Sequence, residues 1–247
     1  MKNRLQFISL MLFIFAAAQL FAQDAEAIMR KAEEKYAFNT SKAEISMLVY
    51  PQADNERNFR EYSILSYGRG EEETYLEFLS PRSIKGLRIL SKGGDQWVYF
   101  SSTGRVRKIA GKAKKESVRG VGGDFSYEDL GGEDMRKKYD FRVLQDRSDK
   151  WVLEGNPKTE DATYSRLVVT VDKSSYLIEK IEYYTEEEGH YKDMYMGEVK
   201  ILGGREMPSQ VVMINREKNS KTVIITHSAL YDISVDEKYF NPNRFYK

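Results

Sequence analysis

Residues 95–109 read DQWVYFSSTGRVRKI, and this stretch decides the fold class. Two strand-like runs flank a short connection that ends in glycine, which predicts a tight antiparallel hairpin. In the first run Val98 and Phe100 alternate with Trp97 and Tyr99, so both faces of that strand are apolar. A sheet with one wet face would be polar at alternate positions. We therefore expect apolar material on each side of the sheet here: a covering helix, a second sheet layer or a ligand cavity.

The same two-residue period runs through most of the chain. β-branched and aromatic residues dominate these runs, and turn sequences too short to hold crossover helices separate them, which predicts antiparallel pairing. The expected strands are 44–49, 59–67, 74–79, 87–91, 96–101, 105–109, 139–145, 151–154, 166–171, 177–184, 191–200, 210–216 and 222–231. So many strands exceed what one flat open sheet usually holds, so the sheet must curl, split or close.

Two segments depart from this period. Residues 24–37 carry apolar side chains at three- and four-residue steps, which predicts an amphipathic helix capped by Asp24 that lies on something apolar. Residues 110–138 open with lysines, continue through a run of glycines, and then resemble a short helix that ends near Leu130. A long glycine-bearing insertion in a sheet protein is either functional, for example as a mobile lid, or disordered.

The N-terminus has the order of a secretory signal. Lys2 and Arg4 precede an apolar run over 5–18, and small residues follow. The run is shorter than the ~20 residues that span a bilayer, which disfavours a permanent anchor. We expect cleavage after Ala22, which leaves one domain, residues 23–247, outside the cytoplasm. The alternative is a buried or anchoring N-terminal helix.

Composition excludes several classes of protein. The chain has no cysteine, which excludes disulfides, thiol chemistry and the acylated cysteine of a bacterial lipoprotein, so we expect an exported product that is soluble and not lipid-anchored. It has 39 basic and 38 acidic residues, and removing Lys2 and Arg4 leaves 37 against 38, a net charge of −1. A nucleic-acid-binding protein would show a basic excess.

Catalytic motifs are absent from the sequence. His190 and His227 lack metal-ligand spacing, and there is neither a Gly-x-Ser-x-Gly elbow nor a phosphate-binding loop. The acidic pairs 128–129 and 133–134 are sequence neighbours, which rarely face one site, so they are interpreted as solvated surface rather than as glycosidase carboxylates. We expect no enzyme, no metal and no cofactor.

One stretch is strongly basic: residues 105–119 hold seven cations and one acid, Glu116. It is interpreted either as the rim of a soluble loop or as a docking patch for an acidic partner or a lipid headgroup. The docking candidates are Arg107, Lys108, Lys112, Lys114, Lys115 and Arg119.

The chain resembles the outer membrane lipoprotein-sorting proteins, the LolA-like group among the LolA/LolB/RseB-type envelope proteins. The pieces that carry the resemblance are 95–100, 104–109, 123–130, 80–81 before 85–86, 176–180, 207–208 and 236–245. The resemblance implies a mainly β fold with few helices: a strongly curved antiparallel sheet, an incomplete barrel, with helices as a lid over its concave face. It also implies a monomeric carrier that takes lipoprotein acyl chains or lipids across the periplasm without chemistry, between an inner-membrane exporter and an outer-membrane acceptor.

Three functions follow as hypotheses. The first is this carrier, the second is an envelope lipid sensor or exporter accessory that binds without transport, and the third, disfavoured, is an enzyme on the same sheet. Alternation along the strands selects the cavity candidates, each of which is equally compatible with an ordinary core position. They are Ile45, Met47, Val49, Leu76, Phe78, Trp97, Tyr99, Phe125, Leu130 and Met213.

Overall fold

The computed structural model describes residues 25–131, 135–160 and 162–247. The predicted signal peptide, residues 1–22, and the acidic pair 133–134 lie outside the described residues. All the strands expected from the sequence are present, with ends that differ by a few residues. They are β1 (Thr40–Tyr50), β2 (Arg60–Arg69), β3 (Glu73–Ser80), β4 (Arg88–Lys92), β5 (Asp95–Phe100), β6 (Arg105–Ile109), β7 (Tyr139–Asp146), β8 (Lys150–Pro157), β9 (Arg166–Asp172), β10 (Ile178–Thr185), β11 (Gly189–Leu202), β12 (Arg205–Asn215) and β13 (Ser220–Tyr231).

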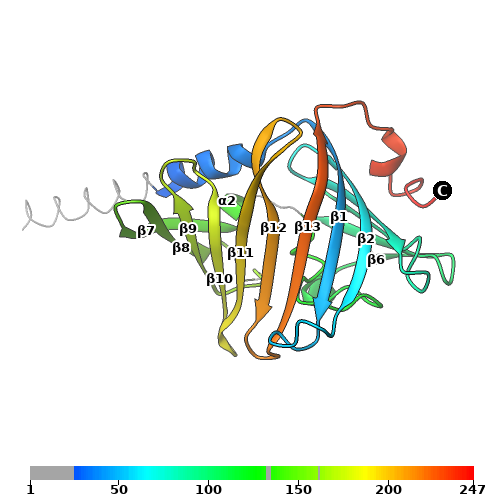
Figure 1. Ribbon diagram of the computed structural model, residues 1–247, viewed down its shortest axis with the longest axis horizontal. Coiled ribbons are helices and arrows are strands. Elements are labelled where there is room, and N and C mark those ends of the chain that lie inside the picture. Colours follow the sequence, from blue (N-terminus) through cyan, green and yellow to red (C-terminus); the bar gives the residue numbers. More distant parts are fainter. Residues whose placement is uncertain (1–24, 132–134, 161) are drawn as a thin grey trace, which may run out of the picture.

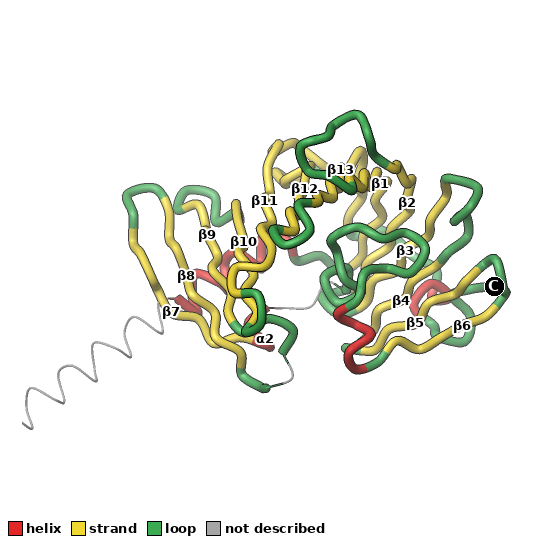
Figure 2. The backbone as a smooth tube through the Cα atoms, turned by 90° about the horizontal axis from the view of Figure 1, so that it is seen from below, coloured by secondary structure: helices red, strands yellow, loops and turns green. Residues whose placement is uncertain are grey.

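These strands form one antiparallel sheet. Its order is β6-β5-β4-β3-β2-β1-β13-β12-β11-β10-β9-β8-β7, so the first strand of the fold pairs with the last. The sheet bends into a trough with β7 and β6 at its two ends, and it does not close (Figure 2). The prediction of a strongly curved antiparallel sheet is therefore confirmed.

Helices are few in the described chain. The predicted N-terminal helix covers residues 25–36 and crosses the trough beside β8–β11 (Figure 1). Three short helices were not predicted: η1 (Gly111–Lys115), α2 (Met135–Lys138) and η2 (Glu237–Phe240).

The short helix expected before Leu130 is wrong, because residues 127–130 form turns. Ser126 and Asp129 bond each other's backbone N–H groups through their side chains, at 2.8 and 3.1 Å. Gly131 N–H then donates to the carbonyl of Glu128 at 2.9 Å. These local bonds offer the backbone an alternative to further helix, so one turn forms and stops.

Two apolar clusters fill the trough. The first joins the N-terminal helix to β7–β11 through residues such as Met29, Leu153 and Val169, all fully buried. The second lies against β1–β5 and includes Val118 and Val121 from the middle segment. The trough is therefore mostly filled by the chain itself, with the helix in one half and the middle segment in the other.

Residues 232–247 cover part of the convex face. Phe240 and Phe245, each 1% exposed, pack with Tyr75 and Leu90 on the outside of β3 and β4. Tyr239 stacks on Tyr67 of β2 with ring centroids 4.3 Å apart. This aromatic cover explains how strands that are apolar on both faces remain out of water.

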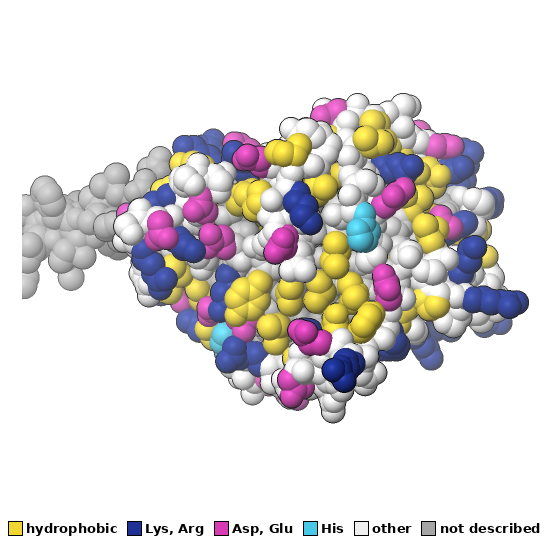
Figure 3. All heavy atoms as spheres, in the orientation of Figure 1, with side chains coloured by type: hydrophobic (Ala, Val, Ile, Leu, Met, Phe, Trp, Pro, Cys, Tyr) yellow, Lys and Arg dark blue, Asp and Glu magenta, His cyan; other side chains and the backbone are white. Residues whose placement is uncertain are grey.

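The central strands keep apolar side chains on the convex face as well. Register aligns Tyr195, Val212, Val223 and Leu48 across β11, β12, β13 and β1. Figure 3 shows hydrophobic side chains gathered over these strands. The two-sided apolar pattern read from the sequence is thus present here too, with Tyr195 39% exposed.

Candidate functional site

The described part of the chain leaves an apolar chamber of about 370 Å³ at one end of the trough. The N-terminal helix, the β2–β3 turn, α2 and strands β10 and β11 all contribute to its wall. The lining residues are Glu33, Tyr36, Ala37, Phe38, Gly70, Glu71, Thr74, Met135, Ile178, Ile181, Met194 and Met196. Three of them are methionines, whose flexible thioethers adapt to irregular apolar ligands.

Tyr36 joins the helix to the far wall of the chamber. Its hydroxyl donates to Met196 Sδ at 3.7 Å and accepts from the backbone N–H of Ile178 at 3.3 Å. Burial raises the pKa of Tyr36 to about 12. The phenol is therefore neutral at physiological pH, and the chamber wall keeps its apolar character.

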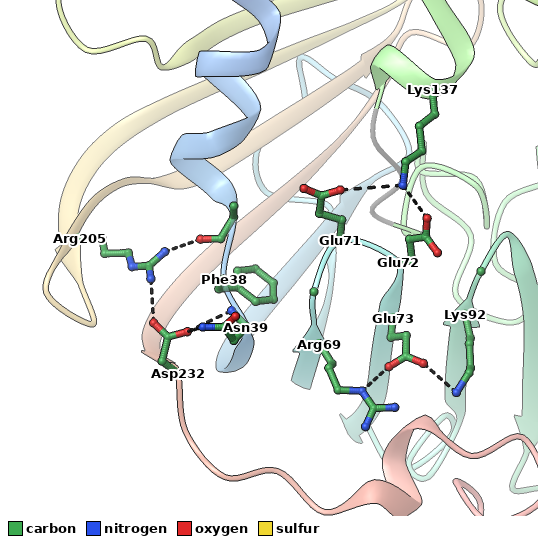
Figure 4. A pocket seen from close by; sticks show the side chains of 13 residues that line it. Phe38, Asn39, Arg69, Glu71, Glu72, Glu73, Lys92, Lys137, Arg205 and Asp232 are labelled. Carbon is green, nitrogen blue, oxygen red and sulfur yellow. Dashed lines mark hydrogen bonds and ion pairs between the residues drawn. The ribbon is translucent and has the colours of Figure 1, made fainter.

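The chamber adjoins a wider, charged groove of about 720 Å³, which we call the mouth. Chamber and mouth share Ala37, Phe38, Gly70 and Glu71 in their walls. Figure 4 shows the charged side chains of the mouth in ion-paired groups near Phe38. Four cationic residues, Arg69, Lys92, Lys137 and Arg205, face four acidic residues, Glu71, Glu72, Glu73 and Asp232.

Ion pairs hold the mouth together. Lys137 Nζ lies 2.5 Å from Glu72 and 3.9 Å from Glu71. Glu73 lies between Arg69 and Lys92, with Lys92 Nζ at 2.7 Å. Burial opposes ionisation of Glu73, but hydrogen bonds from both cations hold the pKa of that carboxyl below its usual value. The mouth is therefore charged on both sides and neutral in sum.

Phe38 stands at the boundary of chamber and mouth. A Cβ atom on Gly68 would lie 2.6 Å from the Phe38 ring, so only glycine lets the ring settle on β2. The ring also packs on Tyr231, with centroids 5.9 Å apart, and Arg205 lies over that tyrosine at 4.6 Å. The passage between chamber and mouth is thus bordered by an aromatic side chain whose position is fixed by its packing on Gly68 and Tyr231.

A buried polar network fixes the middle segment to the floor of the trough. Asp124 is 4% exposed and accepts hydrogen bonds from Ser220 at 2.5 Å and Thr222 at 2.8 Å. Lys192 Nζ donates to the Asp124 carbonyl at 2.7 Å and lies 3.4 Å from Asp129. These bonds attach the buried part of the middle segment, which includes Val118, Val121 and Asp124, to the strands beneath it.

The ten predicted cavity residues are dispersed. None of them lines the chamber. Most are core residues of the trough: Ile45, Met47, Val49, Leu76 and Phe78 lie in the β1–β5 cluster, Phe125 and Met213 in the helix-side cluster, and Leu130 touches both.

Trp97 and Tyr99 lie on the opposite face from the other eight. They pack with the C-terminal aromatic cluster, while Val98 points into the trough and is fully buried. Alternation separates the two faces of β5, but it cannot say which face is concave. A signal for the chamber lining was present in the stripe of the N-terminal helix, which ends in Tyr36.

The predicted docking residues lie on β6 and in the segment that follows it. Lys108 pairs with Asp95 at 2.7 Å, and Arg107 lies 6.0 Å from the Phe100 ring centre. Lys114 donates to the carbonyl of Gly94, and Lys115 donates to that of Ala162 at 3.2 Å. Arg119 is exposed, and the side chain of Lys112 lies outside the description. The structure therefore places Arg107 and Lys108 as neighbours on the edge strand β6, and Lys114 and Lys115 in η1.

Histidines make ordinary hydrogen bonds. His190 lies 3.0 Å from Asp193, and His227 lies 2.8 Å from the Ser46 hydroxyl. Among the residues that the structure describes, no three His, Cys, Asp or Glu side chains gather as a metal site. No helix within the described ranges is long and apolar enough to cross a membrane.

Comparison with known proteins places the fold. A family described only as "uncharacterized protein" has a model that matches residues 70–247, and no curated protein matches the chain. An outer membrane lipoprotein-sorting protein domain from Vibrio parahaemolyticus has a TM-score of 0.81 at 23% identity, over 92% of this chain and 100% of that one.

Two further solved structures agree. A DUF1329 family protein from Desulfovibrio piger has a TM-score of 0.80 at 22% identity, over 90% of this chain and 97% of that one. A LolA superfamily protein from Nitrosomonas europaea has a TM-score of 0.73 at 19% identity, over 88% and 97%. At these identities the likeness establishes the fold.

Proposed function

Because the chain belongs to the family of uncharacterized proteins whose model matches residues 70–247, and because it has the LolA-like fold of lipoprotein-sorting domains, we propose that it is a periplasmic carrier of acyl chains. It binds the chains of lipoproteins or lipids in an apolar cavity and takes them from an inner-membrane exporter towards an outer-membrane acceptor. It acts as a monomer, without catalysis, metal or cofactor.

One observation carries this proposal: an apolar chamber of about 370 Å³ that adjoins a charged mouth. An acyl chain needs no catalytic group to bind there, because each buried methylene contributes about 0.8 kcal/mol. A polar end group would stay in the wet mouth, where the protein already presents charges of both signs.

The proposal is tested with residues 23–247, purified and stripped of lipid. We expect the protein to take up a fluorescent fatty acid, and mass spectrometry of unstripped protein to find bound lipid. Met196→Glu places a carboxylate in the chamber wall and should weaken uptake at least tenfold, because a buried unpaired charge is costly. Val199→Glu, on the same strand at a position 54% exposed, is the matched control and should bind normally.

Two results would contradict the proposal, the first for the carrier itself and the second for the chamber as its site. One is stripped protein that takes up no fatty acid and carries none when purified. The other is unchanged uptake by Met196→Glu, which would move the site away from the chamber.

The second candidate is a sensor or exporter accessory that binds without transport. The exposed cations on β6 and the exposed Lys115 of η1 favour it, since basic side chains attract an acidic partner or a membrane surface. Charge reversal at Lys114 and Lys115 should then abolish capture of a membrane partner while fatty-acid uptake continues. Capture that survives the reversal counts against this second function.

A further inference from the structure

We infer that chamber and mouth together form a site for a single-chain amphiphile: one acyl chain of about 12 carbons lies in the chamber, and a zwitterionic headgroup lies in the mouth. This inference rests on the proposed function and narrows its cargo. It excludes, for the structure as it stands, lipids and lipoproteins that carry two or three acyl chains.

The volume of the chamber determines how many acyl chains the site holds and how long they are. The chamber measures about 370 Å³. A methylene group fills about as much space as a water molecule in the liquid, roughly 30 Å³, so the chamber holds about 12 of them. One extended or bent chain of that length fills it completely, and a second chain has no room.

Among the described residues, the half of the trough beside β1–β5 has no space for a second chain. Val118 and Val121 of the middle segment occupy the half beside β1–β5, at 2% and 0% exposure. Gly123 lies so close to β1 and β13 that a Cβ atom would meet Thr222 at 3.0 Å and Val49 at 3.2 Å. A diacyl or triacyl ligand that placed a further chain in this half would have to displace the segment and break the buried bonds of Asp124.

The position of the mouth fixes where the polar end lies. Chamber and mouth meet at Ala37, Phe38, Gly70 and Glu71. A Cβ atom on Gly70 would meet nothing within 4 Å, so the backbone there borders open space. A chain in the chamber therefore places its headgroup at the β2–β3 turn, beside Lys137.

Charge selects the headgroup. The mouth has four cationic and four acidic side chains, and Lys137 lies between two glutamates that are themselves 57% and 52% exposed. A purely anionic headgroup would meet a carboxylate beside every cation. A headgroup with a phosphate and an ammonium group can face both signs, so the geometry favours a zwitterion.

The test is calorimetric titration of lipid-free protein with lysophosphatidylcholines of 8 to 16 carbons, each below its micelle concentration. Affinity should rise about fourfold per methylene and level off near 12 carbons. Diacyl phosphatidylcholine of equal chain length should bind at least tenfold more weakly. At low salt, lysophosphatidylglycerol of equal length should bind at least fivefold more weakly, with a smaller difference in 0.5 M salt because exposed charges are screened.

Two variants should shift, in opposite directions, the chain length at which affinity levels off. Thr74→Phe adds roughly four heavy atoms to the chamber wall and should shorten the optimal chain by about four carbons, whereas Met194→Ala removes three and should lengthen it by about three. Leu79→Phe adds an aromatic ring at an exposed position of β3, the strand that carries Thr74. This control should leave the chain length at which affinity levels off unchanged.

Each outcome decides something. A rise in affinity that continues to 16 carbons, or diacyl lipid that binds as well, overturns the single-chain site and leaves the carrier standing. Tighter binding of the anionic lipid overturns the headgroup assignment. Absence of binding by every acyl ligand overturns the carrier itself.

Discussion

Replacing Asp124 by alanine tests whether the middle segment is fixed in the trough by its buried carboxylate. The carboxylate accepts hydrogen bonds from Ser220 at 2.5 Å and Thr222 at 2.8 Å, and the residue is 4% exposed. Alanine would leave the buried hydroxyl group of Thr222 and the half-buried one of Ser220 without this acceptor.

The expected loss follows from these contacts. A hydrogen bond to an ionised group contributes about 1.5–3 kcal/mol, so two of them predict that Asp124→Ala lowers the free energy of unfolding by about 3–6 kcal/mol. Asp124→Asn keeps one carbonyl oxygen as acceptor and should lose only about 1–2 kcal/mol.

The assay is equilibrium unfolding in urea, read by circular dichroism, with the slope m checked for each variant. Asp140→Ala is the control: its side chain is 76% exposed and lies 3.4 Å from Lys158, and surface pairs of this kind contribute about 0–1 kcal/mol. A double-mutant cycle with Thr222→Val should give a coupling energy of about 1–2 kcal/mol. A loss below about 1 kcal/mol for Asp124→Ala, or no coupling to Thr222, would refute the reasoning.

Three further predictions concern stability. Lys192→Met should cost about 3 kcal/mol in the same urea assay, because it leaves the buried Asp129 without its cation; an unchanged midpoint would contradict the network. Burial raises the pKa of Tyr36 and Tyr139 from 10.0 to about 12, so the unfolded chain releases these two protons at a lower pH than the folded protein. The contribution of the two phenols to the free energy of unfolding is therefore complete below pH 10 and should be lost as the pH rises to 12. Urea midpoints across that range measure it, and Tyr36→Phe should flatten the decline. Phe240→Ala should lower unfolding free energy by about 3–5 kcal/mol, since the ring is 1% exposed; a loss under 1 kcal/mol would show that the C-terminal cover is dispensable.

Much of the fold was accessible from sequence because its signals are local. A two-residue period fixes which positions of a strand share a face, and short turns force neighbouring strands to run antiparallel. The stripe in residues 25–36 likewise follows from the 3.6-residue turn of a helix. The short helix before Leu130 failed for a local reason as well, since Ser126 and Asp129 close a single turn with their side chains.

The site was not accessible in the same way. Alternation placed Trp97 and Tyr99 together on one face of β5, but the curvature of the whole sheet decided that this face is convex and covered by the C-terminus. The chamber depends on contacts such as that of Tyr36 with Met196, which are 160 residues apart. No local pattern encodes such a distance.

The sequence by itself determined the strands, the antiparallel order of neighbours, the helix stripe and the two-sided apolar character of the central sheet. Tertiary structure alone decided which side is concave, that residues 117–127 fill half of the trough, and that an apolar chamber remains beside a charged mouth. The physical reason is that propensity and periodicity act within a few residues, whereas a cavity is the volume left after distant segments have packed.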